Sequence, residues 1–275
     1  MAMAKILNPD LFDDSPNEDE LYGFELQDNL SEEEIELAMK IVRWGLLRGV
    51  IIVTGAIGSG KDLFGNVVSW VIKHCFKGRK ALRDEKPREL YGYYEPFNSM
   101  VIAQDLSEEI PSEIGRKDTK LYKRMTSLAE QWLNKVGEEK LTGGVLFSTE
   151  FWRYMHNREP FNPMGIILGA ILKRWRHLDL LVIGNAPKRH ELDRYSCLPY
   201  VTSEVKSSWR GHNKAGYRIF PTTYVGERGV LRLSGKPIPI KIDGGIPRDF
   251  LDGRRYFDLF VSKSRTSPQG GVNGL

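Results

Sequence analysis

The sequence predicts an α/β fold in which a mostly parallel sheet is flanked by helices and followed by an antiparallel β extension. Apolar, strand-like runs alternate with segments of helical periodicity from residue 31 to about residue 200, as is typical of a parallel sheet. A glycine-rich loop joins the first of these runs to a helix. After Tyr200 the segments alternate between apolar and polar residues and are divided by glycine-rich turns, which favours antiparallel strands.

The first elements follow from local patterns. Ser31 and Glu34 have the spacing of a capping box and predict the start of a helix. The run Val50–Thr54 is apolar throughout, as expected of a strand buried on both faces, and a helix is expected from Leu63 to about Phe76. The later expectations are a loop over residues 77–99, a short strand at 100–106, a long amphipathic helix at 119–141, a strand at 143–151, a helix at 162–178 and a strand at 179–185.

The domain organisation is expected to be simple. Residues 1–30 are predicted to form an acidic arm, residues 31–265 one main domain that is strand-rich from about residue 200, and residues 266–275 a flexible tail. No apolar run approaches the roughly 20 residues of a membrane span. The two cysteines, Cys75 and Cys197, match no metal-binding spacing, so an intracellular, cytoplasmic setting is expected.

Charge is distributed unevenly along the chain. The net charge is +4, yet residues 1–36 hold twelve acidic residues and one lysine, a net charge of −11, which leaves +15 for the rest. A basic body indicates a surface that meets a polyanion. A solubilising tail beside an ordinary basic surface is the alternative that charge alone leaves open.

The glycine-rich loop predicts a phosphate-binding site. Gly55, Gly60 and Lys61 satisfy the pattern G-x-x-x-x-G-K-[ST], but Asp62 stands where a hydroxyl residue is expected. Backbone N–H groups of such a loop converge on phosphate oxygens at the positive end of a helix. The residues predicted to hold the nucleotide, which we expect to be ATP, are Gly55, Ala56, Ile57, Gly58, Ser59, Gly60, Lys61, Asp62 and Leu63.

Hydrolysis needs a second element, an apolar strand that ends in Asp-Glu. The segment GGVLFSTE is the candidate, and it ends in Thr149 and Glu150. Glu150 is therefore the predicted catalytic base. The hydroxyl and the carboxylate nearest the metal, Thr149 and Asp62, have exchanged places under this hypothesis and both face Mg²⁺. Under the alternative, Asp62 repels the phosphates and the site is weakened or inactive.

A polar residue ends the strand at 179–185. Asn185 stands at a strand end, where ATPases with a phosphate loop often place a side chain that bonds the γ-phosphate and water. Its alternative role is to begin a turn with Gly184 and Pro187.

The order of these elements resembles the FtsK/HerA-like P-loop ATPases, and among them the viral DNA-packaging ATPases and the zonula occludens toxin-like assembly proteins. The resemblance spans residues 45–263 and includes a late aromatic segment at 256–260. It implies a RecA-like (ASCE) sheet, an oligomeric ring, commonly a hexamer, ATP-driven DNA movement in virus or phage assembly, and other viral assembly proteins as partners. It assigns Lys61 and Glu150 to catalysis and Asn185 to the sensor. An arginine from a neighbouring subunit is also implied, with Arg174, Arg176 and Arg189 as candidates.

Two other functions remain open. The stretch GSGKD is also similar to the loop of some nucleoside-monophosphate kinases, and a degenerate assembly protein would bind ATP without turnover. Basic stretches with interleaved aromatic residues, among them KRWRH, KRH and KSSWRGHNKAGYR, fit contacts to a DNA backbone without sequence specificity. A solvated basic face with Trp175 and Trp209 in the core is their alternative.

Overall fold

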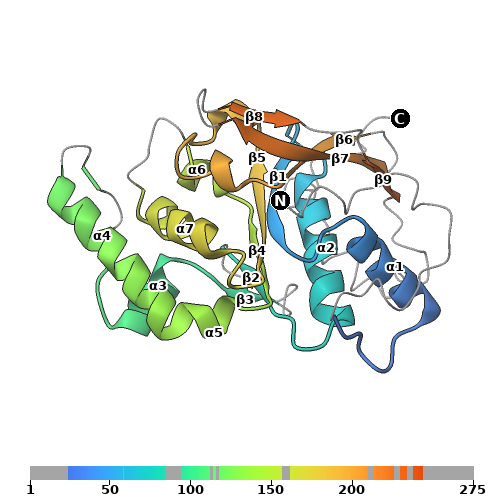
Figure 1. The fold of residues 1–275 in the computed structure, drawn as a ribbon, viewed down its shortest axis with the longest axis horizontal. Coiled ribbons are helices and arrows are strands. Elements are labelled where there is room, and N and C mark those ends of the chain that lie inside the picture. The colour runs from blue at the N-terminus through green and yellow to red at the C-terminus, as the bar shows by residue number, and fades with distance from the viewer. Residues whose placement is uncertain are drawn as a thin grey trace, which may run out of the picture.

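The computed structural model (Figure 1) describes residues 24–57, 59–84, 94–111, 114–115, 118–156, 162–209, 214–225, 230–233 and 238–243. Its helices are α1 Glu32–Arg43, α2 Lys61–Cys75, α3 Ser99–Leu106, α4 Thr119–Trp132, α5 Glu138–Leu141, α6 Phe151–Tyr154 and α7 Pro163–Arg174. The strands are β1 Gly49–Thr54, β2 Ala81–Arg83, β3 Glu95–Pro96, β4 Val145–Ser148, β5 Leu181–Ala186, β6 Ser203–Trp209, β7 Lys214–Val225, β8 Val230–Leu233 and β9 Ile238–Asp243.

All the strands belong to one sheet with the order β3-β2-β4-β5-β1-β6-β7-β8, and β9 also pairs with β7. In this spatial order, the strands β3, β2, β4, β5, β1 and β6 run parallel to one another. Strand β7 pairs antiparallel with β6, β8 and β9. Strand β5 lies between β1 and β4, as in RecA-like P-loop NTPases. The predicted fold class is therefore confirmed. Consecutive strands β5 and β6 lie on opposite sides of β1. The strand order therefore reverses at β1, and a crevice is expected at the carboxyl end of this strand.

Helices cover both faces of the parallel strands (Figure 1). On one face Ile51 and Val53 of β1 pack with residues of α1 and α2. On the other face Val50 and Ile52 pack with residues of α4 and α7. Successive side chains of a strand point to opposite faces, so burial on both faces explains the uninterrupted apolar run of β1.

Three expectations about elements need correction. The segment at 100–106 is helical, because the Asn98 side chain accepts hydrogen bonds from the N–H groups of Met100 and Val101 and caps α3. The second strand is instead β2, inside the expected loop. Strand β6 was expected in the antiparallel extension, but it pairs parallel with β1, so the antiparallel part begins at β7.

The other predicted elements are confirmed by α1, β1, α2, β4, α7 and β5. The long helix is present as α4 and α5, joined by a π-helical segment at Leu133–Gly137. No helix in the described part of the chain is long and apolar enough to span a membrane. Residues 1–23, the aromatic segment at 256–260 and the predicted tail lie outside the described residues.

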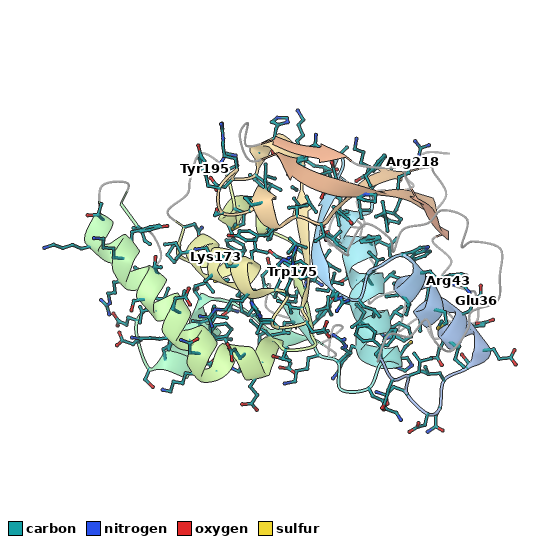
Figure 2. All side chains as sticks on the ribbon, viewed as in Figure 1. Glu36, Arg43, Lys173, Trp175, Tyr195 and Arg218 are labelled. Atoms are coloured by element: carbon teal, nitrogen blue, oxygen red, sulfur yellow. The ribbon has the colours of Figure 1, made fainter. Side chains whose placement is uncertain are left out.

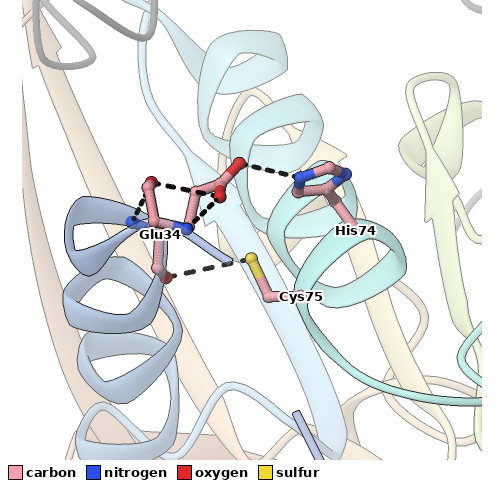
Figure 3. A network of polar contacts seen from close by, with 4 residues as sticks. Glu34, His74 and Cys75 are labelled. Atoms are coloured by element: carbon pink, nitrogen blue, oxygen red, sulfur yellow. Dashed lines mark hydrogen bonds and ion pairs between the residues drawn. The ribbon is translucent and has the colours of Figure 1, made fainter. Parts of the chain in front are cut away.

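A polar network joins α1 to α2 (Figure 3). The Ser31 N–H and the Glu34 carboxylate close the predicted capping box, and a ring nitrogen of His74 lies 2.8 Å from the same carboxylate. Burial acts to raise the pKa of Glu34, but the hydrogen bonds from Ser31 and His74 outweigh it and hold this pKa below its ordinary value. Burial raises the pKa of the Cys75 thiol to about 12, so this cysteine is an unionised core residue.

Candidate active site

The predicted phosphate loop, base and sensor residues lie at the carboxyl ends of the parallel strands. The phosphate loop follows β1, the Glu150 segment follows β4, and Asn185 stands near the end of β5. Strand β5 pairs with both β1 and β4, so these three segments are neighbours along one edge of the sheet. This edge is where parallel α/β sheets bind their ligands.

Strands β6 and β7 hold the phosphate loop from one side. Gly60 has φ 91°, in the left-handed region, and caps α2. The Tyr217 hydroxyl donates to the Gly60 carbonyl at 2.7 Å. The hydroxyls of Ser59 and Ser207 lie 2.6 Å apart. A Cβ atom at Gly55 would lie 2.4 Å from the Ser207 hydroxyl, so glycine is required at this close approach.

Lys61 is folded over its own loop. Its Nζ donates to the carbonyls of Gly55 and Ala56 at 2.8 and 2.9 Å. Burial lowers the pKa of Lys61, and the charge of Asp62 opposes this shift. Ile57 is 95% exposed, Leu63 in the first turn of α2 is partly buried against the core, and Gly58 lies outside the described residues.

Asp62 and Asn185 are brought together although 123 positions separate them in the sequence. The Asn185 amide Nδ2 donates to the Asp62 carboxylate at 2.5 Å. Asn185 is 2% exposed, and its Oδ1 has no hydrogen-bond partner among the described residues. The NH₂ group of Asn185 is bonded to the Asp62 carboxylate, whereas its buried carbonyl oxygen, Oδ1, can accept a hydrogen bond from a ligand or from water.

The Glu150 segment is anchored against β5, the strand that carries Asn185. A Cβ atom at Gly184 would lie 2.4 Å from the Phe151 ring, so glycine on β5 makes room for this aromatic side chain. The Glu150 carboxylate contacts the Arg153 guanidinium of α6 at 2.7 Å. The residue predicted as the base therefore stands in a segment fixed by buried packing and not in a free loop.

Sequence reasoning missed Asp84, which follows β2 directly. Its carboxylate accepts hydrogen bonds from the hydroxyls of Ser148 and Thr149 and from the N–H groups of Thr149 and Glu150. The described residues contain no group of three or more His, Cys, Asp or Glu side chains that could hold a metal ion. A metal role for Asp62 and Thr149 would thus need ligands from the nucleotide or from water, as is usual for Mg²⁺.

Two of the three candidate arginines lie away from this edge. Arg174 ends α7 and pairs with Glu130 and Glu138 at 2.5 and 3.2 Å. Arg176 lies over the ring of Trp175, 5.2 Å from its centroid, and Trp175 is buried in the core. Both arginines precede the first residue of β5 and so lie at the opposite end of this strand from Asn185.

Arg189 lies on the active-site side and is engaged within its own chain. Its guanidinium pairs with Glu204 of β6 at 2.9 Å, and the other oxygen of this carboxylate accepts from the Thr54 hydroxyl at 2.8 Å. Glu204 is 3% exposed. The three residues connect the segment after β5 to the start of the phosphate loop.

Replacing Arg189 with Ala should lower the free energy of unfolding by about 3 kcal/mol, because it leaves the buried Glu204 carboxylate without its cation. The variant R189A/E204Q should recover most of this loss in urea unfolding. The exposed Arg176→Ala is the matched control and should change stability by less than about 0.5 kcal/mol. Wild-type stability of R189A would instead mean that this arginine does not contribute to the stability of its own chain.

Comparisons with known proteins are distant. No family model matches the chain. Polyketide synthase 2 of Metarhizium guizhouense and that of Metarhizium robertsii are each 29% identical over 128 residues, which is 43% of this chain but 6% of either synthase. The chain thus spans only a small fraction of these curated relatives.

Several solved structures are similar to this chain at low sequence identity and low TM-score. The N-terminal domain of zonular occludens toxin from Neisseria meningitidis is 12% identical, with 75% of this chain and 98% of that chain covered and a TM-score of 0.45. The genome packaging NTPase B204 from Sulfolobus turreted icosahedral virus 2, in complex with ATP-gammaS, is 13% identical, with 70% and 98% covered and a TM-score of 0.38. A KaiC-like protein from Pyrococcus horikoshii OT3 is 11% identical, with 68% and 90% covered and a TM-score of 0.32. At these values the fold assignment rests on the sheet topology and the loop.

Proposed function

We propose that this protein is a magnesium-dependent ATPase that moves DNA. The observation that supports this best is the meeting, at one edge of a RecA-like sheet, of the phosphate loop, the buried Asn185 acceptor and the anchored Glu150 segment. Together they supply a phosphate site, a water-orienting group and a base, which are the parts that phosphoryl transfer to water requires.

The loop and α2 bind the triphosphate. Backbone N–H groups at the start of α2 and its dipole favour the phosphate charge. On binding, Lys61 exchanges the carbonyls of Gly55 and Ala56 for phosphate oxygens. An ammonium group gains more from charged oxygens than from neutral carbonyls, so ATP opens this contact.

Asp62 faces the metal in this proposal. A carboxylate beside the phosphates needs a cation between them, and Mg²⁺ is bound by one or two carboxylates together with phosphate oxygens and water. When bound, Mg²⁺ neutralises the charge that develops on the phosphates. Glu150 takes the proton of the attacking water, and the free Oδ1 of Asn185 accepts a hydrogen bond from the same water and orients it.

The exposed face of β6 and β7 offers a surface for DNA. Lys206 and Arg218 stand directly opposite each other on this antiparallel pair, both are exposed, and Arg218 extends outward from β7 (Figure 2). Like charges in directly opposed positions destabilise a sheet, and phosphates of a DNA backbone relieve this repulsion. The neighbouring pair on the buried face, Ser207 and Tyr217, holds the phosphate loop, so DNA on one face of the strands is linked to ATP on the other.

Steady-state hydrolysis tests the proposal. We expect ATP turnover that requires Mg²⁺ and rises when double-stranded DNA is added. ATP binding without turnover would favour the degenerate assembly protein, and transfer of the phosphoryl group to a nucleoside monophosphate would favour the kinase. A ring of subunits and a cytoplasmic or virion-associated setting belong to the same proposal, and sedimentation with and without ATP tests the ring.

The DNA surface has its own variant in this assay. The double variant K206S/R218S should leave the turnover measured without DNA unchanged and should weaken DNA binding. It should also reduce the slope of log affinity against log salt concentration by about 2, because each phosphate contact contributes about 0.9 to this slope. The matched control is Lys120→Ser with Lys123→Ser, two exposed cations on α4 that lie outside the basic stretches named above. Equal losses in both double variants would mean that charge alone matters and that β6 and β7 form no particular surface.

A further inference from the structure

Asp84 is a buried carboxylate that no motif of the sequence explains. It is 6% exposed and follows Arg83, the last residue of β2. Four hydrogen bonds reach its two oxygens, at 2.6 Å from the Ser148 hydroxyl, 3.1 and 3.3 Å from the N–H and hydroxyl of Thr149, and 3.2 Å from the Glu150 N–H. A carboxylate has about four acceptor positions, so both oxygens of Asp84 are engaged by this segment.

The register of the sheet explains why these donors converge. Arg83, the last residue of β2, pairs with Phe147 of β4, so Asp84 lies beside the residues that follow Phe147. The three residues after Phe147, which are Ser148, Thr149 and Glu150, each direct a hydroxyl or N–H donor toward Asp84. Thr149 stands where a strand that ends in Asp-Glu would have its aspartate. The carboxylate at this position therefore comes from the residue that follows the adjacent strand, β2, and not from the end of β4.

We propose that Asp84 is the positioning residue of the active site, which fixes the segment that carries Glu150. This inference rests on the proposed role of Glu150 as the base. Asp84 acts through the backbone of Glu150, because its carboxylate accepts the N–H groups of Thr149 and of Glu150 itself. On the other side of the segment, Phe151 packs against Gly184. Glu150 is thus held between a polar anchor on β2 and an apolar anchor on β5.

The same contacts assign a different role to Thr149. Its hydroxyl and its N–H both donate to one oxygen of Asp84. Thr149 therefore helps to hold the segment, and the carboxylate that faces Mg²⁺ is left to Asp62. The two departures from the usual motif are then independent changes, each with its own partner: Asp62 with Asn185, and Thr149 with Asp84.

The test is Asp84→Asn, which keeps the shape but replaces one acceptor oxygen with an NH₂ group that faces N–H and O–H donors. We expect kcat to fall about 100-fold, as for a misplaced catalytic group, with KM for ATP within about 3-fold of the wild type, since the phosphate loop is untouched. Asp105→Asn is the matched control, because Asp105 is also a carboxylate held by side-chain donors, from Trp132 and Lys140 on α4 and α5. It should leave kcat unchanged.

Two further measurements separate positioning from general damage. In a Glu150→Gln background, Asp84→Asn should cause almost no further loss of kcat, because residues that act as a unit are not additive. Independent losses that multiply would overturn the proposal, as would wild-type kcat in D84N. Hydrogen exchange of the Thr149 and Glu150 amides should accelerate in D84N whether or not the protein hydrolyses ATP, so this readout distinguishes failure of the anchor from failure of the proposed ATPase activity.

Discussion

Glu150→Gln should abolish hydrolysis while leaving ATP bound. Removing a general base lowers kcat by about 10²- to 10⁴-fold, and glutamine keeps the size of the side chain. ATP affinity should change by less than about 3-fold, because the phosphates are bound by the loop and α2 and not by the segment after β4. Turnover measured beside equilibrium binding of a fluorescent ATP analogue checks both expectations.

Lys61→Ala should give the opposite result. Loss of a cation from charged oxygens costs about 2–5 kcal/mol of binding, so ATP affinity itself should fall by roughly 30-fold or more. Lys173→Ala and Glu139→Gln, which alter exposed residues on α7 and α5, are the matched controls and should match the wild type in both assays. If Glu150→Gln retained turnover, the base would have to lie elsewhere, and the proposed mechanism would be wrong.

The parts of the site that could be predicted are those encoded locally. The phosphate loop is a contiguous motif that follows an apolar strand, and both are present as expected. The capping box at Ser31 likewise depends on residues three positions apart. Asn185 was predicted from its place at a strand end, but its contact with Asp62 could not be, because it requires β5 to lie beside β1.

The missed parts depend on pairing between distant segments. Strand β2 has three residues, of which Arg83 is charged, so it offers no apolar run. This arginine is buried because Asn66 of α2 accepts its hydrogen bond and the rings of Tyr94 and Phe147 lie against it. Without β2 there is no reason to single out Asp84. The strand wrongly predicted at 100–106 has a different origin. Seven residues are too few to distinguish helical from strand periodicity, and the helix is favoured here by the Asn98 side chain that caps it.

Asp62 should make nucleotide binding unusually dependent on Mg²⁺. A carboxylate about 4 Å from a phosphate charge costs about 4 kcal/mol at an intermediate dielectric constant unless a cation lies between them. In the unliganded site the Asn185 amide stabilises this carboxylate. Asp62→Thr and Asp62→Asn should therefore bind ATP at least about 10-fold more tightly than the wild type in EDTA, with a smaller difference in Mg²⁺. The Asn variant isolates the charge, because it retains an acceptor for Asn185. If neither variant bound more tightly without Mg²⁺, Asp62 would not face the phosphates.

The double variant D62T/T149D then decides between two accounts of the altered motif. If the two residues have simply exchanged places, restoring the usual order should recover the turnover that Asp62→Thr loses. We expect no recovery, because the Thr149 hydroxyl lies 3.3 Å from the Asp84 carboxylate, and an aspartate at position 149 would bring a second negative charge against a buried one. Adding Asp84→Asn to the double variant removes that repulsion but also weakens the anchor of Glu150. A triple variant that turns over faster than the double variant, though more slowly than the wild type, would therefore identify the Asp84 charge as the obstacle. Full recovery in the double variant would instead support the exchange and would place the carboxylate of residue 149 at the metal.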